Sequence, residues 1–178
     1  MRPSVAAVLL GTILCVGQDL AAQAPDPAAV QAAIARLEFM VGRWRGEAWQ
    51  LRGNERVQTQ MVETVDRKLD GAVLLVEGRG TIAAPGAPER VVHHALGVIS
   101  YDPRSGTYTL RSYLANGQSG DFALTLIDGG VSWTREVPGG RIRNTARFTG
   151  TEWHEVGEYS ADGTSWTRVM ELRLTRER

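Results

Sequence analysis

Cysteine is almost absent from this sequence, which has a single one, Cys15, among 178 residues. Cys15 lies within an N-terminal segment that has the features of a removable signal. Without it, the chain has no thiol for a disulfide bond, a thiolate metal site or a cysteine nucleophile. The fold must therefore be stabilised by side-chain packing.

The sequence also lacks an excess of charge of either sign, because 20 lysines and arginines balance 20 aspartates and glutamates. Proteins that bind nucleic acid or an anionic membrane surface usually carry a basic excess. We therefore expect no nucleic acid partner.

Long apolar runs are confined to the N-terminus, where Arg2 precedes an uncharged run from Val5 to Gly17. Ala22-Gln23-Ala24 then supplies the small residues that a signal peptidase needs. After residue 24 no apolar run approaches the roughly 18 residues that span a bilayer. These features predict a signal peptide over residues 1–24, one domain over residues 25–178 without a transmembrane segment, and a periplasmic or secreted location.

A lipid-anchored protein is the alternative interpretation of this N-terminus. It would use Cys15 as the lipidated residue, but Leu14 occupies the preceding position, where a small residue is expected.

One amphipathic helix is predicted at the start of the domain. Asp26 followed by Pro27 is typical of an N-cap with proline in the first helical position. Apolar residues then recur at helical spacing: Val30, Ala33, Ile34, Leu37 and Val41. We expect this helix from about Pro27 to Met40, with Gly42 ending it.

Beyond Arg43 the sequence has nine turn signals separated by short runs rich in β-branched and aromatic residues, which predicts ten strands. The signals are Arg52-Gly53-Asn54, Asp70-Gly71, Pro85-Gly86, Asp102-Pro103, Asn116-Gly117, Asp128-Gly129-Gly130, Pro138-Gly139-Gly140, Thr149-Gly150 and Asp162-Gly163. No second helical pattern could provide the crossovers of a parallel sheet. An antiparallel meander of this length closes most easily on itself, because closure removes exposed strand edges. The fold class is therefore all-β, an up-and-down, lipocalin-like barrel of about ten antiparallel strands with one short N-terminal helix.

Alternation within the last strand indicates which residues face inward. Met170, Leu172 and Leu174 share one face, whereas Glu171 and Arg173 lie on the other. Leu172 and Leu174 should point into the barrel.

The segment Gly42-Arg43-Trp44-Arg45-Gly46, at the head of the first strand, resembles the start of the calycin barrels: lipocalins, fatty-acid-binding proteins and the haem-binding nitrobindins. Two segments, 39–47 and 153–166, are also similar to a family of small exported bacterial proteins of uncharacterised function. Nitrobindins have Gly-x-Trp-x-Gly-x-Gly here, whereas this chain has Ala48 in the last place. The lipocalin resemblance implies that Arg176 covers Trp44 in a cation–π contact. Gly42, Trp44, Gly46 and Arg176 are thus expected to be structural.

Arginines and aromatic residues are the first candidates for ligand binding. Arg111-Ser112-Tyr113 is similar to the Arg-x-Tyr pair with which fatty-acid-binding proteins hold a carboxylate. Arg143 lies among arginines on two neighbouring predicted strands and could bind an anionic head group if it faces inward. The alternative is a solvated face paired with carboxylates such as Glu136. Trp44 and Trp133 complete this set.

The three histidines are the candidates for a metal or haem site. His93 and His94 are adjacent in a predicted strand and so point to opposite faces, which argues against a three-histidine zinc site. His154 lies near the position where the nitrobindin resemblance implies an axial haem ligand. The alternative for His154 is a solvated or hydrogen-bonded strand residue.

No catalytic motif is present, since the serines lack a Gly-x-Ser-x-Gly context and Glu155 and Glu158 lie on opposite faces of their strand. Glu152, His154, Val156 and Glu158 share a face, which permits an acid–base cluster. The leading interpretation is an exported barrel that binds a small hydrophobic or amphipathic molecule, without a metal or cofactor. The second is a nitrobindin-like haem protein using His154, and the third is an enzyme that uses the barrel cavity.

Overall fold

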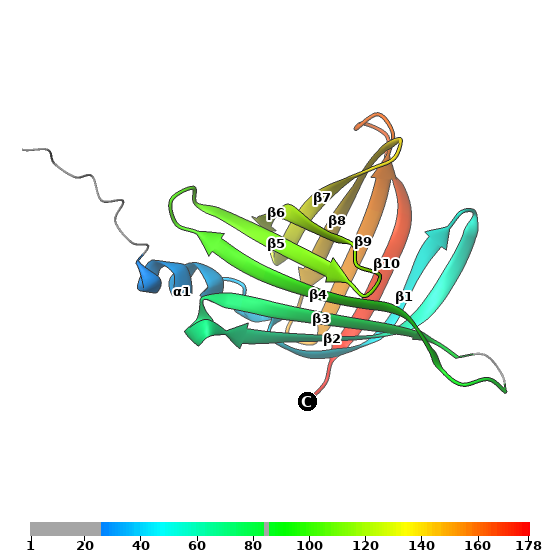
Figure 1. The fold of residues 1–178 in the computed structure, drawn as a ribbon, viewed down its shortest axis with the longest axis horizontal. Coiled ribbons are helices and arrows are strands. Elements are labelled where there is room, and N and C mark those ends of the chain that lie inside the picture. The colour runs from blue at the N-terminus through cyan, green and yellow to red at the C-terminus, as the bar shows by residue number, and fades with distance from the viewer. Residues whose placement is uncertain (1–25, 84–85) are drawn as a thin grey trace, which may run out of the picture.

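The computed structural model describes residues 26–83 and 86–178, and the predicted signal peptide lies outside these residues. The described chain forms a closed antiparallel barrel in which each strand pairs with its neighbours in sequence and the first also pairs with the last (Figure 1). The strands are β1 (Gly42–Arg52), β2 (Glu55–Lys68), β3 (Val73–Ile82), β4 (Arg90–Asp102), β5 (Thr107–Leu114), β6 (Ser119–Ile127), β7 (Gly130–Val137), β8 (Gly140–Phe148), β9 (Glu152–Ser160) and β10 (Thr167–Arg176). The predicted up-and-down barrel is confirmed.

Eight of the nine predicted turn signals lie at junctions between two strands, and the ninth, Pro85-Gly86, includes a residue outside the described part of the chain. Several of these junctions need a left-handed backbone, such as Gly53 with φ 60° and Gly139 with φ 79°, which glycine adopts without steric cost. A short 3-10 helix, η2 (Leu69–Gly71), joins β2 to β3.

The helix α1 (Pro27–Ala35) begins as predicted, since the Asp26 side chain accepts a hydrogen bond from the Ala28 N–H at 3.0 Å. It ends at Ala35 rather than at Met40. The N–H groups of Arg36 and Leu37 bond to carbonyls three residues back, which tightens the chain before the 3-10 helix η1 (Glu38–Met40). This tightening places Leu37 and Met40 in the barrel end, where they are buried. No helix among the described residues has the length and apolar character needed to cross a bilayer.

Trp44 forms the floor of the barrel at the end covered by α1 and η1, since Ile34, Leu37 and Met40 belong to the same buried cluster. Its ring is fully buried, with the ring centroids of Phe148 and Trp153 5.8 Å and 6.0 Å away. The indole N–H donates to the Met40 carbonyl at 2.9 Å, so its one polar group is satisfied. This end of the barrel is closed by aromatic packing.

Arg176 lies over the Trp44 ring, with its guanidinium carbon 4.0 Å from the ring centroid. It also donates to the carbonyls of Phe39, at 2.8 Å, Gly150, at 3.1 Å, and Val41. The end of β10 is thus tied to the segment that precedes β1.

Two glycines of β1 are required by close approaches at this floor. Gly42 has φ 135°, and a Cβ atom there would lie 2.6 Å from Nη1 of Arg176. At Gly46, a Cβ atom would overlap the carbonyl oxygen of Arg173. Any larger residue would displace the last strand.

Candidate functional site

The inward face of each strand follows from burial and register. On β2, Met61, Glu63 and Val65 are buried while the residues between them are more exposed. Glu63 pairs with Trp44 of β1, and Glu155 of β9 pairs with Leu172 of β10. Paired residues project to the same side of a sheet, so two carboxyl groups point into the barrel.

Glu63 is an acid buried inside the barrel, with only 8% of its surface exposed. Burial, together with repulsion from the nearby Glu155 carboxyl, raises the pKa of Glu63 to about 8. No hydrogen bond within the described chain opposes this increase. Glu63 is therefore protonated at neutral pH.

Glu155 is the second buried acid, with 7% of its surface exposed. Burial raises the pKa of Glu155 to about 7, although a hydrogen bond from Asn144 and the attraction of Arg135 oppose the increase. The Asn144 Nδ2 to Glu155 Oε1 distance is 3.1 Å. The Glu155 carboxyl therefore gains or loses its proton near neutral pH.

Two buried polar atoms beside these acids have no hydrogen-bond partner within the described residues. They are Oδ1 of Asn144, an acceptor, and Nε1 of Trp153, a donor. Asn144 and Trp153 are only 5% and 4% exposed, and the Trp153 N–H lies near Glu155 without hydrogen-bond alignment. An unpaired buried polar group costs about 1–3 kcal/mol, so a bound molecule that pairs with these atoms would recover that energy.

Glycine at position 78 makes room for the Glu63 carboxyl. Gly78 pairs with Glu63, and a Cβ atom at Gly78 would lie 2.5 Å from Glu63 Oε1. The Glu63 side chain therefore folds against bare β3 backbone, which holds its carboxyl within the barrel.

The end of the barrel opposite Trp44 admits solvent. The inward-facing His93 and Trp133 are only half-buried there, and Arg135 is exposed. The barrel wall nevertheless lowers the pKa of Arg135 by burial, while Glu155 opposes this by attraction. Burial and then the neighbouring His94 lower the pKa of His93. A neutral imidazole and a partly hydrated guanidinium thus lie at the mouth.

Of the six predicted ligand-binding residues, only Trp44 and Trp133 face inward. Trp44 is sealed in the floor, whereas Trp133 lines the interior above it.

Arg111 and Tyr113 lie on the outer wall, because their neighbours Leu110 and Ser112 take the inward positions of β5. Arg111 forms two hydrogen bonds with Asp121, of 2.6 Å and 2.5 Å, and these lower the pKa of Asp121. Tyr113 is 44% exposed. Neither residue can hold a carboxylate inside the barrel.

Arg143 and His154 also lie on the outer wall, one position out of phase with the inward residues Asn144 and Glu155. Arg143 pairs with Glu158 at 2.8 Å and stacks on Trp166. His154 Nε2 lies 2.9 Å from Glu171 Oε1. His154 therefore cannot ligate haem within the barrel. Among the described residues, no group of three or more His, Cys, Asp or Glu side chains could hold a metal ion.

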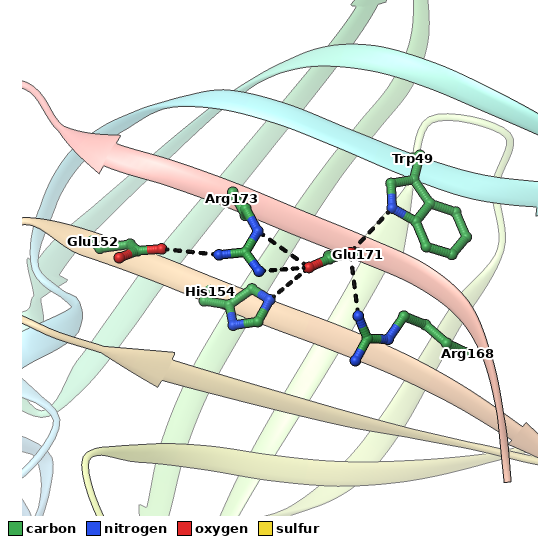
Figure 2. Close-up of polar contacts among 6 residues, drawn as sticks. All are labelled: Trp49, Glu152, His154, Arg168, Glu171 and Arg173. Atoms are coloured by element: carbon green, nitrogen blue, oxygen red, sulfur yellow. Dashed lines mark hydrogen bonds and ion pairs between the residues drawn. The ribbon is translucent and has the colours of Figure 1, made fainter.

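A polar network covers the outer wall where β1, β9 and β10 run side by side (Figure 2). Glu171 lies at its centre and accepts hydrogen bonds from His154, Trp49, Arg168 and Arg173. Burial alone would raise the pKa of Glu171, but the hydrogen bonds from His154, Trp49 and Arg173 outweigh it and hold the pKa at about 2. We call this set the Glu171 network.

Two surface grooves, of about 370 Å³ and 500 Å³, open on the same outer wall. The first is lined mainly by outward-facing residues such as Trp49, Glu171 and Arg173, and the second includes His154 and Arg168. Most of their charged groups already form ion pairs with one another or with neighbouring side chains of the outer wall. The buried acids inside the barrel therefore form the stronger candidate site.

Sequence reasoning missed Glu63, because the alternation along β2 was not used to identify its inward face. The alternation Met61, Glu63, Val65 was a usable signal, since an acid stands between two apolar residues of one face. Trp153, Glu155 and Gly157 gave the same signal on β9.

Comparisons with known proteins find similar proteins by structure alone. No model of a known protein family matches the chain. No curated protein matches it by sequence.

Solved structures with the same fold include Rv2717c from M. tuberculosis and the S-type phycobiliprotein lyase CPES from Guillardia theta. Rv2717c matches with a TM-score of 0.60 and 14% identity over 82% of this chain and 98% of that one. The lyase matches with a TM-score of 0.54 and 10% identity over 86% of this chain and 99% of its own. This chain therefore has a calycin-like barrel fold, and identities this low establish no shared activity.

Proposed function

We propose that the protein binds a small amphipathic molecule inside the barrel. The polar part of the ligand would lie beside Asn144 and Trp153, and its apolar part would lie against Leu110, Trp133 and Met170, which are inward-facing and half-buried. The observation that carries this proposal is the pair of unsatisfied buried atoms beside Glu63 and Glu155. Sites for small molecules typically combine an apolar lining with a few convergent polar groups.

Titration with 1-decanol, followed by calorimetry, tests whether the interior takes up such a molecule. Ala95 faces inward opposite Gly78, so Ala95→Trp should fill the interior and abolish uptake. Ala123 is exposed on the outward face of β6, and Ala123→Trp is the matched control that should bind as the wild type does. Equal binding by both variants would place the decanol outside the barrel and refute the proposal.

Haem is a second candidate ligand, and one observation favours it: His93 faces the interior. Because burial lowers the pKa of His93, its imidazole is neutral, which is the form that ligates iron. A titration with hemin distinguishes the two candidates. A Soret band that is lost in His93→Ala but kept in His154→Ala would establish haem as the ligand, whereas we expect no coordinated band.

We also propose that the protein is exported to the periplasm or secreted, on the basis of the N-terminal pattern alone. A ligand-binding barrel in that location would meet molecules that enter from outside the cell.

A further inference from the structure

We propose that the interior site selects amphipathic ligands that carry a single positive charge, such as an alkylammonium, and that Glu63 and Glu155 bind this charge. This inference rests on the proposed function and specifies the chemical class of the ligand.

The two buried acids lack a full complement of positive charge inside the barrel. Glu63 and Glu155 are each more than nine-tenths buried, and each is close enough for the two to influence one another. Two carboxylates that share a site cannot both ionise without a compensating cation. Within the described chain, Glu63 has no basic partner of its own.

The other ionisable groups that face the interior do not supply the missing positive charge. Arg135 is attracted to Glu155 but is exposed at the mouth, and His93 is neutral. Arg176 already donates hydrogen bonds to backbone carbonyls on the outer side of the Trp44 ring. Arg67, in phase with Glu63 on β2, lies near the Trp44 end of the barrel and pairs with Glu38 on the surface. Among the described residues, Tyr108 and Tyr159 also face inward and donate to the carbonyls of Ala33 and Gly139. With both acids ionised and Arg135 charged, one positive charge is still needed.

Hydrogen bonding favours the same ligand. A primary ammonium has three N–H donors and no acceptor. The site offers acceptors on three side chains, the carboxylates of Glu63 and Glu155 and the unpaired Oδ1 of Asn144. An ionised Glu155 is also a stronger acceptor for the nearby Trp153 N–H. A ligand carboxylate would instead meet two acids and an amide oxygen.

Cation binding should release protons from the site. Burial raises the pKa of Glu63 to about 8 and that of Glu155 to about 7, so the empty site holds at least one proton at neutral pH. A bound cation favours both carboxylates and expels that proton. Affinity for the cation should therefore increase as the pH rises toward about 8.

Three probes with the same ten-carbon chain test the inference: decylamine and decanoate, each below its micelle concentration, and 1-decanol below its solubility limit, all at pH 7.5. We expect decylammonium to bind at least about 10-fold more tightly than the other two. Calorimetry in two buffers of different ionisation enthalpy should show proton release with decylamine and none with decanol. Glu63→Gln should remove most of the preference, whereas Glu152→Gln, on the outer wall, should keep it.

The outcomes separate this inference from the proposed function. If decanol or decanoate binds as tightly as decylamine, in a manner blocked by Ala95→Trp, the charge selectivity is refuted and the binding function stands. If no probe binds in a manner blocked by Ala95→Trp, both the charge selectivity and the proposed binding function are refuted. Should Glu63→Gln not fold, Glu155→Gln replaces it, and the absence of proton release from the wild type would by itself overturn the inference.

Discussion

Glu63 introduces a pH dependence into the stability of the fold. Its pKa is raised by burial from 4.5 to about 8, so between these pH values the unfolded chain ionises while the folded chain stays protonated. The stabilisation from Glu63 is therefore complete below about pH 4.5 and is lost as the pH rises through about 8. Each pKa unit corresponds to about 1.4 kcal/mol, so the loss is of the order of several kcal/mol.

Glu63→Gln should flatten this dependence, since a glutamine cannot ionise in either state. Urea denaturation at pH 5 and pH 8.5 measures it, and the variant should lose less stability between the two values than the wild type does. Glu152→Gln on the outer wall is the control. Equal losses in all three proteins would show that Glu63 is not held protonated.

Trp44 should be the costliest single aromatic residue to remove. Trp44→Ala would leave a large void beneath Arg176 among Phe148 and Trp153, at an expected cost of about 3–5 kcal/mol. Chemical denaturation measures this cost. Trp166→Ala is the comparison, because Trp166 is only half-buried and stacks on a surface arginine, and its loss should be much smaller. Similar midpoints for both variants would contradict the role given to Trp44.

At the scale of strands, the Glu171 network joins β10 to both of its neighbours. Its contacts include Trp49 of β1 and His154 of β9 (Figure 2). Glu171→Gln should cost about 1.5–3 kcal/mol at pH 7, the range for hydrogen bonds to a charged group. Because the pKa of Glu171 is lowered from 4.5 to about 2, this stabilisation is present above about pH 4.5 and is lost as the pH falls toward 2.

Denaturation at pH 7 and pH 2.5 tests this expectation. The difference between wild type and Glu171→Gln should shrink at the lower pH. Glu47→Gln, an exposed residue of β1 that accepts one hydrogen bond from Gln60, should show little difference at either pH. If Glu171→Gln is less stable than the wild type by the same amount at pH 2.5 as at pH 7, the ionised carboxylate is not the cause of that difference.

The number of strands was predictable because turn chemistry is local. Residues such as Gly53 and Gly139 are required by the backbone angles of their own turns, whatever surrounds them. The end of α1 was not predictable, since Leu37 and Met40 leave the helix to pack under the barrel, which is a tertiary effect.

The inward face was predicted for β10, where Leu172 and Leu174 are buried, but the sequence left it open for the strands that carry the candidate arginines and the buried acids. Arg111 and Arg143 alternate as predicted, but alternation does not say which face is inside. Only the pairing of each strand with its neighbours settles this, as Glu63 with Trp44 shows. For the same reason the buried acids were overlooked while exposed arginines and His154 were proposed.

At the scale of the whole chain, the prediction of export concerns residues 1–24. We expect the mature protein to begin at Pro25 after cleavage behind Ala24. Intact mass measurement of protein recovered from the periplasm or medium checks this. Retention of Met1 to Ala24, or a lipid on Cys15, would contradict it.

Because Trp44 of β1 pairs with Arg176 of β10, the hydrogen bonding of β1 cannot be completed until β10 is present. While the chain is being synthesised, one edge of β1 has no partner until β10 has left the ribosome. A chain terminated before residue 167 would keep two open edges, on β1 and β9, that can pair with another copy. Such truncated chains should aggregate rather than form a smaller barrel, and ring closure should limit the rate of folding.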